Sequence, residues 1–222
     1  MVEHWSPKPS VPGSSPGGPA SLFMNIKIIF ISISIFFGFL GYYPYLKDLI
    51  THKTQPHVFT WLIWAITQGT AVAGIWYGGG GLGAITLTIY TALAILIFFI
   101  SISNGKRNIT KSDIMVLSIA FIAILIWWLL NNPLLAVLLV TGIDLIGYIP
   151  TFRKSYYKPW SETASSWGIF ALANIFSILA LERYSLLTLV YVSAVCVINI
   201  ILYTYLIVRR KKLLVDTSEK HT

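Results

Sequence analysis

The segment GYYPYLK at Gly41–Lys47 recurs further along the chain, in the same order, as GYIPTFR at Gly147–Arg153. The correspondence continues at one constant offset without a gap, so that Trp61 falls on Trp167. A single offset held across roughly 30 residues indicates an internal duplication. Both copies are mostly apolar, so the duplicated unit is a set of membrane helices. Duplicated helix sets are typical of membrane transporters.

The composition is that of an integral membrane protein. Of 222 residues, 56% are hydrophobic and 11% are charged, whereas about a quarter of the residues in a soluble domain are normally charged. The formal net charge of +8 does not indicate a nucleic-acid partner, because the cations lie in short loops between apolar runs. The single cysteine, Cys196, lies inside an apolar run and has no second cysteine to pair with.

Seven apolar segments are long enough to cross a bilayer, which requires roughly 20 residues per helix. We place these predicted helices at about 26–46, 57–77, 82–102, 113–130, 134–153, 164–181 and 186–208. Loop residues separate them, including the glycine run Gly78–Gly81, which we expect to form a tight outer turn. The predicted fold is therefore an all-α membrane protein with seven transmembrane helices.

Lysine and arginine residues predict the orientation, because cytoplasmic loops are enriched in both. The loops after the first, third, fifth and seventh segments are basic: Lys47 and Lys53; Lys106, Arg107 and Lys111; Arg153, Lys154 and Lys158; Arg209, Arg210, Lys211 and Lys212. The opposite loops contain only Arg183, and Lys27 stands at the start of the first segment. We therefore expect a protein of the plasma membrane or a bacterial inner membrane, with its N-terminus outside and its C-terminus cytoplasmic.

The repeat divides the chain into two triplets of helices. We predict a first three-helix repeat at 24–104, a linker helix at 105–132, a second repeat at 133–210 and a cytoplasmic tail at 211–222. A single linker helix gives both triplets the same orientation, so the repeats are parallel. Residues 1–23 are rich in Pro, Ser and Gly without an apolar period, and we expect a disordered leader.

This 3+1+3 layout resembles the SWEET and PQ-loop superfamily of seven-helix membrane proteins. Pro44 and Pro150 stand at the inner ends of the first helices, and the PTF sequence that begins at Pro150 is similar to a stretch common in SWEET first helices. Tyr45 and Thr151 follow the prolines where the superfamily has glutamine. The stretch Lys53–Trp61 is also similar to bacterial membrane proteins without an assigned function. The resemblance implies the 3+1+3 fold and the transport of a small polar solute.

Polar residues from several predicted helices lie at a similar depth. Since each helical residue rises about 1.5 Å, the bilayer midplane lies about ten residues into a span. The polar residues near that depth are Gln68, Tyr90, Asp144, Asn174 and Asn199. We expect them to line a substrate site between the two triplets. An alternative stays open for the amides, which can also hold helices together in lipid at under about 1–2 kcal/mol each.

Asp144 is the acidic residue at mid-depth. A charge at the bilayer centre costs at least about 2 kcal/mol, and such residues usually face a cavity or carry ions or protons. We expect Asp144 to bind a cationic part of the solute or a coupling proton. The alternative is that Asp144 is hydrogen-bonded and only holds helices together.

A gate or hinge is predicted at the inner ends of the two repeats. Its residues pair across the duplication: Pro44 with Pro150, Trp61 with Trp167, and Tyr42 with Tyr148. The prolines would kink or loosen their helices, and the neighbouring tyrosines would line the inner mouth. The tryptophans lie near the cytoplasmic ends of their helices, where either an interfacial anchor or a gate explains them.

The predicted function is transport of a small polar solute, such as a sugar or a vitamin, by alternating access. A receptor or sorting factor on the same fold is the alternative, since some PQ-loop relatives bind peptides. We expect no enzyme, because neither a zinc pattern nor a nucleophile–base pair is visible. The four histidines fall outside the predicted spans or at the very start of one: His4, His52, His57 and His221. We expect no cofactor, and the sequence does not determine the oligomeric state.

The predicted orientation is tested by labelling from outside intact cells. A cysteine placed in the Lys106–Lys111 loop should not react with a membrane-impermeant maleimide, because this basic loop is expected to be cytoplasmic. A cysteine at Asn131, in the loop at the opposite end of the next helix, should react and serves as the control. Ready labelling of the basic loop would overturn the topology.

Overall fold

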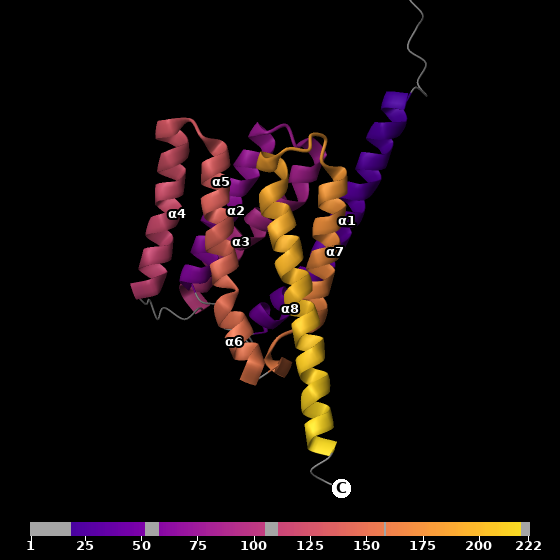
Figure 1. Cartoon of the computed structure of the whole chain (residues 1–222), viewed down its shortest axis with the longest axis vertical. Coiled ribbons are helices and arrows are strands. Elements are labelled where there is room, and N and C mark those ends of the chain that lie inside the picture. Colours follow the sequence, from indigo (N-terminus) through magenta and orange to yellow (C-terminus); the bar gives the residue numbers. More distant parts are fainter. Residues whose placement is uncertain (1–18, 52–57, 105–110, 158, 219–222) are drawn as a thin grey trace, which may run out of the picture.

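The structure is a computed structural model that describes residues 19–51, 58–104, 111–157 and 159–218. All regular secondary structure in these ranges is helical, which confirms the predicted all-α class. The elements are α1 (Pro19–Ile50), α2 (Val58–Tyr77), η1 (Gly81–Gly83), α3 (Ala84–Asn104), α4 (Lys111–Leu130), α5 (Pro133–Gly147), α6 (Ile149–Tyr157), η2 (Pro159–Ser161), α7 (Ala164–Ala180) and α8 (Leu186–Ser218). Most of the long helices lie side by side along one axis (Figure 1).

Three helical stretches in the described ranges are long and apolar enough to cross a membrane, which indicates an integral membrane protein. They are Ser21–Lys47, Gly81–Ile102 and Leu186–Leu214. Three further apolar helices are shorter: Leu117–Leu130, Pro133–Gly147 and Ala164–Ala180. Large apolar side chains cover the outside of the bundle, including Phe36, Phe99 and Trp128, the last of them 78% exposed. Such an apolar surface fits contact with lipid. Passage of all seven predicted segments through the bilayer stays a prediction.

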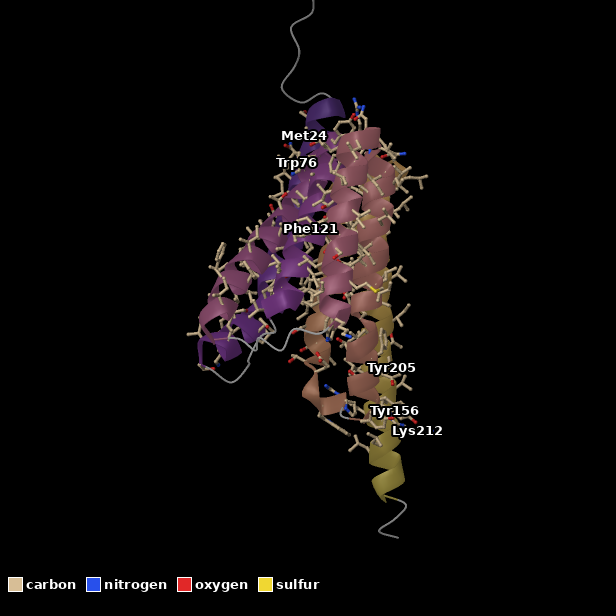
Figure 2. All side chains as sticks on the ribbon, turned by 90° about the vertical axis from the view of Figure 1, so that its left-hand side faces the viewer. Met24, Trp76, Phe121, Tyr156, Tyr205 and Lys212 are labelled. Atoms are coloured by element: carbon tan, nitrogen blue, oxygen red, sulfur yellow. The ribbon has the colours of Figure 1, made fainter. Side chains whose placement is uncertain are left out.

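The helix boundaries differ from the predicted ones at both ends of the chain. α1 begins at Pro19, so the last residues of the predicted leader, 19–23, are helical; the rest of it lies outside the described residues. The predicted cytoplasmic tail continues α8 as far as Ser218. A helix of 33 residues is about 50 Å long, well beyond the roughly 30 Å of a hydrocarbon core. In Figure 2, Met24 and Trp76 lie toward one end of the molecule and Tyr156 and Lys212 toward the other.

The two duplicated prolines lie in different helical surroundings. α1 continues through Pro44 to Ile50, whereas the predicted segment 134–153 is divided between α5 and α6 at Tyr148. Tyr148 keeps helical backbone angles, φ −77° and ψ −21°. The backbone therefore stays helical between α5 and α6, and the helical hydrogen-bond pattern is interrupted there. Pro150 is the second residue of α6, a position in the first turn where its missing N–H costs little.

The helices contact one another in a regular order. α1 packs most extensively against α7, α2 against α3, and α7 against α8. α3 also contacts α1, and α8 also contacts α5. α5 in turn contacts α2, and α4 lies at the edge of the bundle against α5 and α2 (Figure 1). We refer below to the end of the bundle where α1 begins as the Lys27 end, and to the opposite end as the Lys47 end.

Hydroxyl groups join three helices inside the bundle. Ser34 in α1 donates through Oγ to the backbone carbonyl of Ala173 in α7, at 2.6 Å. Thr86 in α3 donates through Oγ1 to Ser34 Oγ, at 2.8 Å. Both hydrogen bonds are buried, so these polar groups have the partners that an apolar interior requires. They fix α1, α3 and α7 against one another.

Candidate functional site

Asp144 lies in the interior of the bundle, 4% exposed, and joins three helices. It projects from α5, and its Oδ1 accepts a hydrogen bond from Thr67 Oγ1 in α2 at 2.5 Å. Its Oδ2 accepts a hydrogen bond from the Tyr191 hydroxyl in α8. Thr67 and Tyr191 are themselves buried. The carboxyl group is therefore held at both oxygens by protein hydroxyls, each from a different neighbouring helix.

This arrangement limits what Asp144 can bind directly. An ionised carboxylate only accepts hydrogen bonds, whereas a protonated carboxyl must donate one. The two hydroxyl donors match the accepting form, and a proton on either oxygen would require the facing hydroxyl to accept instead of donate. The protonation state of Asp144 can thus affect the hydrogen bonds that join α5 to α2 and to α8.

Two other candidate residues present buried polar atoms without a partner. Within the described ranges, three buried side-chain atoms lack a hydrogen bond: Gln68 Oε1, the Tyr90 hydroxyl and Ser155 Oγ. The first two belong to the predicted substrate site, on α2 and α3, and Tyr90 is 7% exposed. Leaving such a group unsatisfied costs roughly 1–3 kcal/mol. In native proteins such groups call for an explanation such as a functional role or a bound molecule.

Asn174 and Asn199 are both buried and lie on different helices. Asn199 in α8 accepts through Oδ1 a hydrogen bond from the Tyr148 hydroxyl, at 3.0 Å. Asn174 in α7 stands seven residues after Trp167, so the two share one face of the helix. Gln68 stands seven residues after Trp61 on α2 in the same way. The duplicated amides therefore share a helix face with the duplicated tryptophans.

An aromatic cluster connects the candidate residues of α1 and α3 with α7. The Tyr42 ring lies edge-on to the rings of Tyr90 and Phe170, with centroid distances of 5.2 Å and 5.0 Å. Two glycines of α1 make room for these rings. A Cβ atom on Gly38 would meet the Tyr90 ring and hydroxyl, and one on Gly41 would meet the Phe170 ring. Close approach of backbone and ring is possible there only with glycine.

The predicted gate tryptophans face other aromatic side chains. Trp61 is buried, and its indole N–H donates to the Tyr45 hydroxyl at 3.1 Å. Trp167 is half-buried, with its ring centroid 5.7 Å from that of Tyr148. Burial of Trp61 does not fit an anchor in the lipid interface, where the ring would lie at headgroup level. Both tryptophans are available to an inner gate.

The structure brings the predicted residues together in pairs. Tyr42 meets Tyr90, and Tyr148 meets both Trp167 and Asn199. The partners of Asp144, however, are Thr67 and Tyr191, which the sequence analysis missed. Depth counted along the sequence favoured Asn199 on the last helix. Depth alone does not reveal which helices are neighbours, so it did not point to Tyr191, which reaches Asp144 from α8. The signal for Thr67 was its place next to Gln68.

Among the described residues, no group of three or more His, Cys, Asp or Glu side chains could hold a metal ion. A shallow hollow on the surface is lined by residues of α4 alone, including Phe121 and Trp128. Comparison with protein-family models, curated proteins and solved structures gave no match to this chain.

The structural role of the Asp144 hydrogen bonds is tested by Thr67→Val, which removes one hydroxyl donor and keeps the side-chain shape. We expect the free energy of unfolding to fall by about 1–2 kcal/mol, because a buried carboxyl oxygen loses its partner. Thermal unfolding of the purified protein in detergent measures this. The control is Thr91→Val, since the Thr91 hydroxyl bonds only to Leu87 O of its own helix. Equal unfolding temperatures for the two variants would contradict the assigned role.

Proposed function

We propose that this chain transports a small polar solute across a membrane by alternating access. The observation that carries the proposal is the pair of buried polar atoms without partners, Gln68 Oε1 and the Tyr90 hydroxyl. An apolar bundle has no structural need for them, and a polar solute between the helices would satisfy both. One atom can only accept a hydrogen bond, while the other can donate or accept. A solute with hydroxyl or amide groups meets that requirement.

The helix contacts support an arrangement of two parallel triplets. α1, α2 and α3 form the first triplet, α5, α7 and α8 the second, and α4 is the linker. In each triplet the third helix contacts the other two. Between the triplets, the first helix of one contacts the second helix of the other, as α1 does with α7 and α5 with α2. The contacts are those expected from a rotation about an axis along the membrane normal.

Individual side chains support the same arrangement. The duplication places Gly38 on Asp144 and Gly41 on Gly147. Gly41 lies against Phe170, and Gly147 lies against Trp64, the residue that the duplication places on Phe170. Likewise, a tyrosine of the third helix reaches the first helix in each triplet. Tyr90 lies against Gly38, and Tyr191 reaches Asp144.

Within this proposal the interface between the triplets holds the solute at mid-depth. Gln68, Tyr90 and Asn174 contact the solute. Asn199 positions Tyr148 nearer the Lys47 end, which is the cytoplasmic end of the predicted topology. The duplicated tryptophans and the proline-containing segments close that end. Relative movement of the triplets then exposes the solute alternately to the two sides.

Asp144 is the coupling group in this proposal. Its hydrogen bond with Thr67 joins the second triplet to the first, and its hydrogen bond with Tyr191 lies within the second triplet. A proton on the carboxyl would make one of these hydroxyls the acceptor instead of the donor, so that the proton of that hydroxyl needs another partner and the link changes. Uptake of a proton would thereby alter the balance between the two conformations, which is the requirement for coupled transport.

The test is uptake into liposomes that contain the purified chain. A thermal-shift screen over sugars, vitamins, amino acids and nucleosides first identifies a stabilising solute, since a ligand of the native state raises the unfolding temperature. We expect saturable flux of that solute. Saturable binding without flux would reject the transporter in favour of the receptor or sorting factor.

The coupling role is tested by Asp144→Asn at matched protein amounts. The amide keeps the side-chain shape and can hydrogen-bond to both hydroxyls, but it cannot exchange a proton. We expect the variant to insert and fold, with flux lost or no longer dependent on pH. The measurement is initial uptake rate against pH for both proteins. Identical pH profiles would reduce Asp144 to a structural residue.

A further inference from the structure

Lys27 connects α1 to the end of α7 and to the loop that follows α7. It is buried in α1, 5% exposed. Its Nζ donates to the backbone carbonyls of Leu179 and Leu181 at 2.6 Å and 2.7 Å, and to the Tyr184 hydroxyl at 3.0 Å. The last carbonyls of a helix have no partners within it and favour a cation. Lys27 of the first triplet thus caps the end of α7 in the second.

The glycine run supplies further links between the same two parts. The carbonyl of Gly80 accepts from the backbone N–H of Glu182 at 3.0 Å. The N–H of Leu82 donates to Glu182 Oε1 at 3.1 Å. The carbonyl of Gly83 accepts from Ser177 Oγ at 2.7 Å. The turn between α2 and α3 is therefore hydrogen-bonded to the end of α7 and to the loop that follows it.

Glycine at two of these positions permits the close approach. A Cβ atom on Gly83 would lie 2.7 Å from the backbone N and Cα of Leu181, atoms that no side-chain rotation can move away. Gly81 has φ +56° and lies against the Glu182 side chain, a backbone conformation that other residues adopt at a cost. The expected tight turn is thus also a surface shaped to receive the loop after α7.

We propose that these groups form a reversible clasp that closes the Lys27 end of the interface between the triplets. The clasp consists of Lys27 and Gly80–Gly83 on one side and Ser177–Tyr184 on the other. It holds the structure closed at this end, and its release opens a path along α1 and α7 toward the mid-depth layer. This inference rests on the proposed transport function, for which it identifies the gate opposite the predicted inner one. The loop residues Glu182–Ser185 are exposed, and an exposed loop can open locally without unfolding of the bundle.

The clasp is tested by the reactivity of a buried reporter beneath it. Ile31 lies one helical turn from Lys27 and is buried, so Ile31→Cys reports opening at this end. The native Cys196 is replaced by alanine in every variant. Gly83→Ala and Lys27→Met each weaken the clasp, the first by steric contact and the second by removing Nζ. The control is Gly142→Ala, because a Cβ atom there meets nothing within 4 Å. The maleimide reaction rate of the purified full chain in detergent is measured.

We expect the reporter to react about tenfold faster in the Gly83→Ala and Lys27→Met variants than in the control, because the rate follows the population of the open form. Equal rates in all variants would overturn the clasp. If one variant fails to fold, the other decides alone, since the two change different contacts of the clasp: Lys27 in α1 and Gly83 in the turn before α3. The assay needs no solute, so faster labelling without flux in liposomes would support the clasp while rejecting transport. Flux with unresponsive labelling would reject only the clasp.

Discussion

The hydrogen bonds of Asp144 are the constraint on which the interior depends. A carboxyl group buried in an apolar bundle must have hydrogen-bond partners. Leaving it without them costs more free energy than most packing contacts contribute. Thr67 and Tyr191 provide these partners from α2 and α8. Those two helices are thereby fixed against α5 at one depth. In the proposed arrangement, the contact of α2 with α5 also lies between the two triplets.

In the proposed arrangement, the two triplets are similar in packing and different in polar chemistry. The position of Asp144 in the second corresponds to Gly38 in the first, and the tyrosine that reaches it has no acceptor there. In the second triplet the Tyr191 hydroxyl is hydrogen-bonded to Asp144, whereas in the first triplet the Tyr90 hydroxyl has no partner. Under the proposed function, this difference between the two copies leaves the Tyr90 hydroxyl free to hydrogen-bond to a solute. At the Lys27 end, by contrast, backbone groups and Lys27 satisfy one another across the interface.

Apolar runs and chain breaks predicted the positions of the helices, because a long apolar run between loop residues is the main signal of such a helix. The interruption at Tyr148 was not predicted, since Tyr148 keeps helical angles and differs only in its hydrogen bonds. The candidate amides were found by depth, and Asn174 and Asn199 are indeed buried. The partners of Asp144 and of Lys27 were missed, because they depend on which helices are neighbours. Lys27 was taken for an exception to the charge pattern, and its partners are backbone carbonyls that no side-chain pattern reveals.

The central claim is that the unpartnered groups at mid-depth serve a solute, and solute affinity after removal of one such group tests it most directly. Tyr90→Phe deletes the hydroxyl and keeps the ring against Gly38. The account predicts that the Kd for the solute rises about tenfold, equivalent to about 1.4 kcal/mol, while the solute-free variant unfolds at no lower temperature. Ser155→Ala is the control, since Ser155 Oγ in α6 is buried and unpartnered but lies outside this layer. An unchanged Kd for Tyr90→Phe, or an equal rise for Ser155→Ala, would contradict the account.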